Sequence, residues 1–170
     1  YGYQDDIKRF LPLLDVSGIT VAKRREVICY LAEYGMIDKA YGLVRDFGYD
    51  YLEGPAREKI CTHAVVASEF EEDDLLLGLA CSVFFDGGGN ESILIYLCRF
   101  YQGPTKHMAQ IWKAAEQMFI DTFELEERIL TQMLYTTDYI GCAEEIYDSY
   151  QAGGGKEQIC DAYLTYYANT

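Results

Sequence analysis

The stretch Glu26-Val27-Ile28-Cys29-Tyr30-Leu31 decides the fold, because its opening pattern recurs along the chain. Each copy reads glutamate, any residue, isoleucine, then cysteine or leucine. The later copies begin at Glu58, Glu91, Glu127 and Glu157. Successive glutamates are therefore separated by 32, 33, 36 and 30 residues. This period is typical of repeats in which each unit is a hairpin of two helices.

Apolar residues at helical spacing, helix caps and glycines divide the chain into successive repeat units. Thr20, Asn90 and Asp121 each stand where a capping side chain would start a helix. Ser68 precedes Glu71 by three residues, which is the capping-box spacing and predicts a helix from Glu69 onward. The predicted units lie near residues 1–18, 20–50, 55–87, 90–121, 122–152 and 156–170.

The sequence predicts an all-α fold, because no alternation of period two is long enough for a strand. The expected architecture is an open right-handed α-solenoid of antiparallel helical hairpins, with about nine helices in a single repeat domain over residues 1–170. The chain opens and closes inside the repeat pattern. We therefore expect it to be an excised piece of a longer protein.

The composition argues against two classes of partner. The net charge is −14 and the sequence pI is about 4.4, so a nucleic-acid backbone would be repelled by the chain as a whole. Docking on an anionic membrane is disfavoured for the same reason. The longest apolar run, Leu75 to Phe85, has 11 residues, whereas a membrane span needs about 20. We expect no nucleic-acid binding and no membrane contact from this segment.

Six cysteines lie among apolar residues at helical core positions, and none forms a CxxC pair. Their expected role is that of small hydrophobic side chains with reduced thiols, and reduced thiols indicate a cytoplasmic location. The alternative, a disulfide framework, is typical of short and loop-rich secreted chains. The cysteines are Cys29, Cys61, Cys81, Cys98, Cys142 and Cys160.

The period, together with small residues at Ala40 and Ala143 that are followed by aromatic residues, resembles tetratricopeptide-type repeats. The segment Gly141–Tyr147 is similar to the second helix of such a unit. The chain also resembles part of the very long, uncharacterised bacterial proteins that contain divergent helical repeats. These resemblances imply stacked helix pairs, and they do not indicate any activity.

The residues give no support for catalysis, a cofactor or a metal. The two histidines, His63 and His107, fall on different predicted helices. Cys61 and His63 are two positions apart on a helix, so they point to different sides and do not suggest a dyad. No close group of cysteines and histidines has the spacing of a zinc site. The sequence therefore predicts no catalytic, cofactor-binding or metal-binding residues.

The chain contains 16 tyrosines, an unusual number for its length. One interpretation is that tyrosine fills the wide seams between helices and keeps its hydroxyl group in water. The other is that Tyr34, Tyr101 and Tyr135, near the ends of first helices, line a groove that binds a partner. An acidic groove lined with tyrosine would favour a basic peptide or protein.

The favoured hypothesis for function is a non-enzymatic module for protein–protein interaction or scaffolding. One alternative is a fragment of a carboxylate-dependent helical hydrolase or lyase, in which several acids would converge in one pocket. The other alternative is a purely structural spacer, which would lack exposed tyrosines at a groove.

Overall fold

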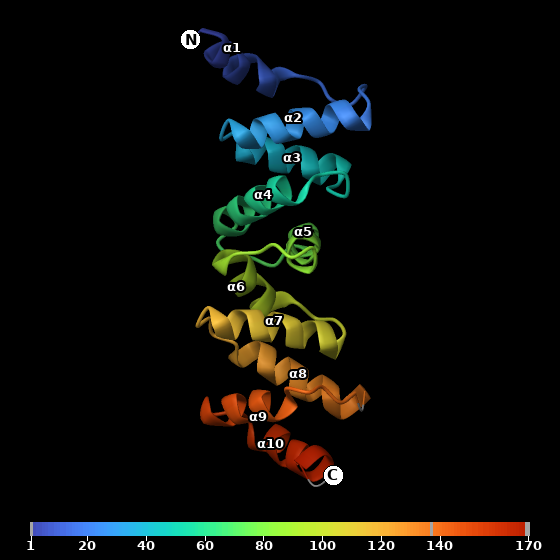
Figure 1. Ribbon diagram of the computed structural model, residues 1–170, viewed down its shortest axis with the longest axis vertical. Coiled ribbons are helices and arrows are strands. Elements are labelled where there is room, and N and C mark those ends of the chain that lie inside the picture. The colour runs from blue at the N-terminus through green and yellow to red at the C-terminus, as the bar shows by residue number, and fades with distance from the viewer. Residues whose placement is uncertain (1, 137, 169–170) are drawn as a thin grey trace. The chain divides into compact units, whose positions relative to one another are not determined.

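The computed structural model describes residues 2–136 and 138–168, and every regular element in these residues is helical (Figure 1). The predicted all-α fold is confirmed. None of the described helices combines the length and the apolar character that crossing a bilayer requires. The α-helices are α1 (Gly2–Phe10), α2 (Val21–Glu33), α3 (Ile37–Phe47), α4 (Gly54–Ala67), α5 (Asp74–Phe85), α6 (Glu91–Phe100), α7 (Thr105–Gln117), α8 (Phe123–Thr136), α9 (Ala143–Ala152) and α10 (Glu157–Tyr163). A 3-10 helix, η1 (Leu11–Leu13), follows α1, and a π-helix, η2 (Leu164–Ala168), follows α10.

The helix count differs slightly from the prediction. The described residues contain four successive helix pairs, from α2–α3 to α8–α9, with α1 before the first pair and α10 after the last. This arrangement gives ten α-helices, where the sequence predicted about nine. The predicted segments near residues 1–18 and 156–170 each contain one of the two additional helices, so only the total of about nine was one too low.

The recurring motif marks the first helix of each pair. Its isoleucine lies in α2, α4, α6 and α8, and in each of them it is 0 % exposed. In the fifth copy, on α10, Ile159 is half-buried and the next residue, Cys160, is buried. The period read from the sequence therefore reflects one core position that each hairpin repeats.

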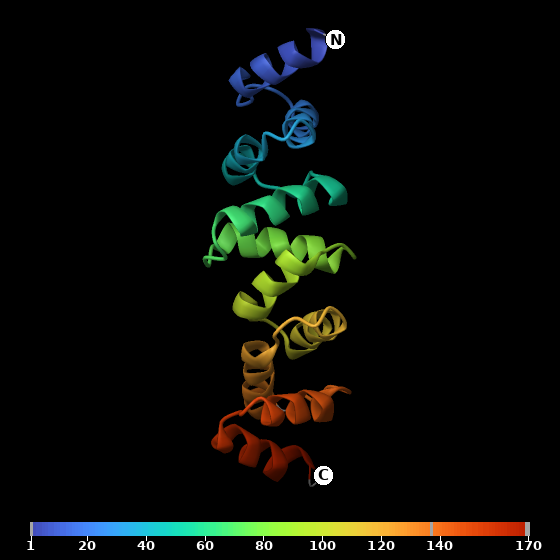
Figure 2. The same ribbon diagram turned by 90° about the vertical axis from the view of Figure 1, so that its left-hand side faces the viewer.

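The contacts divide the chain into two compact units, Tyr1–Ile93 and Leu94–Thr170. In the first unit, α2 packs on α3 and α4, α3 packs on α4, and α4 lies against α5, as both views show (Figures 1 and 2). In the second unit, α8 packs on α7, α9 and α10. Contact with both the next helix and the one after it is typical of a solenoid-like stack. The prediction of a single repeat domain remains a prediction.

Capping side chains begin several helices where the sequence predicted them. Thr20 and Asn90 each accept a hydrogen bond at 3.3 Å from the backbone N–H three residues on. Asp121 accepts one at 3.0 Å from the N–H two residues on. These bonds satisfy amide groups that have no partner within the helix.

The predicted helix start at Glu69 is wrong. Glu69 and the next residue have φ values of 53° and 59°, which are left-handed rather than helical. The Ser68 hydroxyl donates to the Val65 carbonyl at 2.9 Å, so it belongs to the end of α4. Helix α5 begins at Asp74, and the Asp73 carboxylate caps it by accepting the N–H three residues on at 2.9 Å.

All six cysteines are free, and four of them are buried. Burial raises the pKa of the Cys61 thiol and of the Cys98 thiol to about 12. Both side chains are therefore neutral at physiological pH and pack as small apolar groups. The helical seams contain these thiols, as the sequence predicted.

Candidate functional site

The three tyrosines predicted to bind a partner have different environments. Tyr34 ends α2 in the first unit and is half-buried. Tyr101 and Tyr135 belong to the second unit. Tyr101 is only 9 % exposed, and its hydroxyl oxygen lies 3.4 Å from Nδ1 of His107. Tyr135, near the end of α8, is 83 % exposed. Of the three rings, that of Tyr135 is the most available for contact with another molecule.

Tyr135 borders a groove of about 390 Å³ on the surface of α8, here called the α8 groove. Met108 of α7 forms an apolar part of its wall and is itself fully buried. The remaining lining side chains are polar or charged: Gln102, Glu127, Arg128, Thr131 and Gln132. An apolar wall with polar groups around it suits the side chains of an extended segment.

The two charged residues of the α8 groove are engaged within the protein. Glu127 Oε1 lies 2.6 Å from Lys156 Nζ, and its Oε2 accepts a hydrogen bond from the Tyr150 hydroxyl at 2.8 Å. The contact with Lys156 lowers the pKa of the Glu127 carboxyl, and the Tyr150 bond adds to this effect, against the opposing effect of burial. The Arg128 guanidinium donates to the backbone carbonyls of Cys98 and Arg99. These bonds give the groove a wall with a fixed geometry.

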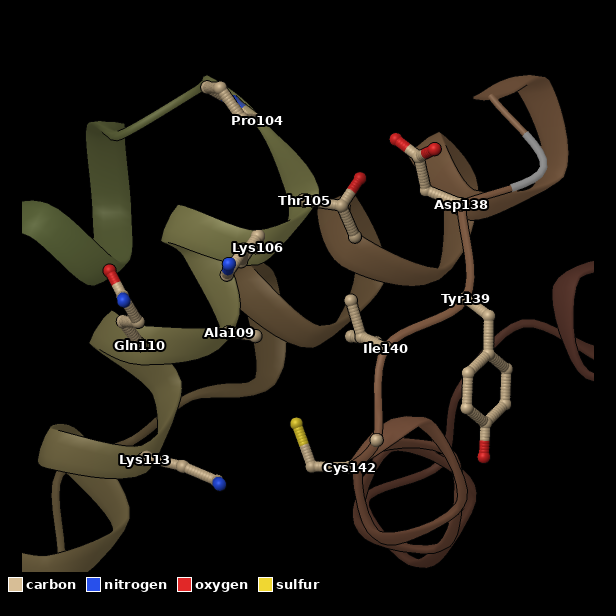
Figure 3. Close-up of a pocket in the computed structure, with 11 residues that line it drawn as sticks. Pro104, Thr105, Lys106, Ala109, Gln110, Lys113, Asp138, Tyr139, Ile140 and Cys142 are labelled. Atoms are coloured by element: carbon tan, nitrogen blue, oxygen red, sulfur yellow. The ribbon is translucent and has the colours of Figure 1, made fainter.

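A second and larger depression, here called the α7 cleft, lies between α7 and the segment 138–142 (Figure 3). Its volume is about 620 Å³. Pro104, Ala109, Ile140 and Cys142 contribute apolar surface, and Tyr139 stands at the edge with 76 % of its surface exposed. The cleft is within the size range of small-molecule sites.

Polar groups of the α7 cleft come mainly from α7. Lys106 and Lys113 are two helical turns apart on one face, with Gln110 between them. Thr105 is 1 % exposed, and its hydroxyl has no hydrogen-bond partner. On the opposite side lies Asp138, near Thr105 and away from Lys113 (Figure 3).

The thiol in the α7 cleft is not an activated nucleophile. Burial raises the pKa of Cys142, and the Lys113 ammonium opposes this shift only in part. Figure 3 shows Lys113 extending toward this cysteine. A reactive cysteine needs a lowered pKa, so Cys142 serves as an apolar part of the wall.

The first unit contains an open depression of about 630 Å³ beside α3 and α4. His63 lines it, and its Nε2 lies 2.9 Å from Asp38 Oδ1. Asn90 Nδ2 donates to Thr62 Oγ1 at 2.7 Å. Cys61 is fully buried, whereas His63 is exposed, so these two side chains do not form a catalytic pair.

Among residues 2–136 and 138–168, no three histidine, cysteine or acidic side chains are grouped so that they could hold a metal ion. Sequence reasoning missed the residues of the α7 cleft. The only signal was the spacing of Lys106, Gln110 and Lys113 along one helical face, and a helix of a solenoid often has such a solvated face.

Part of this chain is similar to a known protein family. Residues 73–170, more than half of the chain, match a family model described as "Family of unknown function (DUF5717) C-terminal". Neither the curated proteins nor the solved structures contain a match to this chain. The family description assigns no activity, so inferences about function depend on the geometry of the two depressions in the second unit.

Proposed function

We propose that this chain, which belongs to the DUF5717 family of unknown function, is a protein-binding module and not an enzyme. One observation carries the proposal: the Tyr135 ring is 83 % exposed and borders the α8 groove. Tyrosine provides a large contact area with few rotatable bonds, and it is enriched among residues that dominate binding energy. We expect an extended peptide segment of a partner to lie across this ring.

The groove offers two kinds of contact to such a segment. The exposed ring of Tyr135 can contact an apolar side chain, whereas Thr131 and Gln132 can form hydrogen bonds with a peptide backbone. Glu127 and Arg128 already have hydrogen-bond partners inside the protein, so a ligand does not have to supply these bonds. The groove therefore favours recognition by shape and hydrogen bonding.

The net negative charge of the whole chain favours a partner of positive charge. With 28 acidic and 14 basic residues, the protein attracts basic molecules over distances up to the Debye length. We propose a peptide or protein segment of net positive charge as the partner. Its charge would raise the association rate more than the affinity.

Two further proposals accompany this function. The solenoid-like packing and the period of the hairpins support a relation to tetratricopeptide-type repeats. The free and mostly buried cysteines support a reducing, cytoplasmic location.

The hydrolase alternative has less support. A general acid that works near neutral pH needs a carboxyl group with a raised pKa. The carboxyl group that lines the α8 groove, Glu127, has a lowered pKa. Its bonds to Lys156 and Tyr150 suit a structural role.

Selection from a library of short random peptides displayed on phage tests the proposal. We expect enriched sequences that combine lysine or arginine with an apolar residue. A synthetic peptide of the consensus sequence should bind the wild-type protein, and Tyr135→Ser should weaken its affinity about tenfold or more.

The matched control is Tyr30→Ser, which removes an exposed tyrosine from α2 in the first unit. This variant should bind the consensus peptide as the wild type does. Failure to enrich any peptide would contradict the proposal, and so would equal binding by the two variants.

A further inference from the structure

The α7 cleft has a chemistry that differs from that of the whole chain. The basic residues of the second unit are Arg99, Lys106, Lys113, Arg128 and Lys156. Lys156 pairs with Glu127, and Arg128 donates to two backbone carbonyls. Among the described residues, neither Lys106 nor Lys113 takes part in an ion pair, and both line the same cleft.

Among the lysines of the described residues, only Lys23 and Lys156 take part in ion pairs, so an unpaired lysine is common in this protein. Lys106 and Lys113 differ from the other lysines in their position, because both project from one face of α7 along the wall of a cleft of about 620 Å³. Together they make a local site where a negatively charged group would be stabilised.

The wall of the cleft near Thr105 and Asp138 has a different polarity. The Thr105 hydroxyl is buried at this wall without a hydrogen-bond partner, which carries a free-energy cost. Asp138 lies on the same side and would repel an anion there (Figure 3). An uncharged polar group of a ligand could supply the bond that Thr105 lacks, while the negative group of the ligand lies beside Lys106 and Lys113.

The remaining surface of the cleft is mainly apolar. Ala109, Ile140 and Cys142 lie there, and the thiol is neutral. The exposed ring of Tyr139 stands at the edge, where it could cover a flat ligand. A cleft with an apolar floor and a few converging polar groups is the usual form of a small-molecule site.

From these observations we propose that the α7 cleft binds a small molecule that carries a carboxylate or phosphate group on an apolar body the size of an aromatic ring. Lys106 and Lys113 would bind the oxyanion, and Ile140 and Tyr139 would contact the ring. This proposal is independent of peptide binding at the α8 groove, since it uses other residues and another ligand.

The test is to titrate the full ¹⁵N-labelled chain with small-molecule probes and to monitor the chemical shifts of its amide groups. The probes are phenylacetate, phenyl phosphate, inorganic phosphate and the cation phenethylammonium. We expect saturable shifts at residues 105–113 and 138–142 with the first two probes. The tighter of these two identifies the preferred oxyanion. Inorganic phosphate should bind at least about tenfold more weakly, because it lacks the apolar body, and phenethylammonium should not bind.

Two double variants that lose the same positive charge distinguish binding in the cleft from a general effect of the protein's charge. Lys106→Gln with Lys113→Gln should raise the dissociation constant about tenfold or more. Lys8→Gln with Lys39→Gln, two exposed residues of the first unit, should change it less than about twofold. The proposal is overturned if neither aromatic anion gives saturable shifts in the cleft, if both double variants lose affinity alike, or if inorganic phosphate binds as tightly as phenyl phosphate.

Discussion

Phe119 shows how a single residue can depart from what its backbone position favours. It is the most exposed of the large apolar side chains in the described part of the chain, at 97 %, and its φ is 57°. It lies just beyond α7, where its N–H bonds to the Glu116 carbonyl and the next N–H bonds to the Ala115 carbonyl. Glycine is the usual residue at this position, because a side chain disfavours the left-handed conformation.

Replacing Phe119 with glycine should therefore raise the free energy of unfolding by about 1 kcal/mol, since it relieves the left-handed penalty and removes no buried contact. Urea unfolding measures this change. Phe119→Ala provides the control, because alanine keeps the penalty and should leave stability nearly unchanged. Equal increases in the free energy of unfolding for glycine and alanine would show that the exposed ring, and not the backbone conformation, destabilises the wild type.

Gly155 illustrates the opposite case, a glycine that a side chain cannot replace. A Cβ atom at this position would collide with the ring of Tyr150. That ring is fully buried and stacks on Phe123 at 5.0 Å between centroids. Its hydroxyl also accepts the Lys156 N–H at 3.0 Å, so it has little freedom to move.

We expect Gly155→Ala to lower the free energy of unfolding by about 2 kcal/mol, the usual range for overpacking a core. Gly141→Ala is the matched control, because no heavy atom lies within 4 Å of its added Cβ. Chemical denaturation of both variants checks the prediction. A loss of similar size at the two sites would argue against the close contact with Tyr150.

At the scale of helices, local patterns predicted most starts and failed where two signals compete. Thr20, Asn90 and Asp121 cap their helices as the sequence indicated. Ser68 has the same local pattern, but its hydroxyl bonds backward to a carbonyl of α4, and Asp73 caps the next helix instead. A hydroxyl can both donate and accept, so spacing alone does not decide which helix it serves.

The site was less predictable than the fold because it depends on contacts between helices. Tyr101 and Tyr135 both stand near helix ends in the sequence, yet one is buried and the other is exposed. The contact of Tyr101 with His107, in the following helix, distinguishes them. The α7 cleft likewise needs the segment 138–142 to lie across α7, and no local periodicity specifies that approach.

The bonds that join α8 to the start of α10 give a prediction with a definite pH dependence. Glu127→Gln should lower the free energy of unfolding by about 1 kcal/mol at neutral pH, through loss of the ion pair with the exposed Lys156. The pKa of Glu127 is lower in the folded state than its ordinary value of 4.5. The stabilising effect is therefore complete above the ordinary value and is lost as pH falls through the lowered one.

Urea unfolding of both proteins at neutral pH and at about pH 3 measures this difference. The difference in the free energy of unfolding between the wild type and the variant should be smaller at the acidic pH. A difference in the free energy of unfolding that stays constant or increases on acidification would contradict the assigned ion pair.

At the scale of the whole molecule, the dominant feature is the charge of −14. Repulsion among so many acidic side chains destabilises the compact state, and salt screens this repulsion. The melting temperature should therefore rise by a few degrees between about 0.01 M and about 0.5 M sodium chloride. Calorimetry or circular dichroism measures the shift.

Neutralising two exposed acids provides the control. The double variant Asp50→Asn with Glu72→Gln carries less charge and should show a smaller rise. A melting temperature that falls with salt would mean that attractive ion pairs outweigh the repulsion.

Hydrogen–deuterium exchange of the full chain, with and without the consensus peptide from the phage selection, tests the central claim most directly. A module that binds a partner at Tyr135 should show slower exchange in α7 and α8, around the α8 groove, while the amides of the first unit keep their rates. Unchanged exchange in α7 and α8 at saturating peptide, or protection confined to the first unit, would contradict the claim.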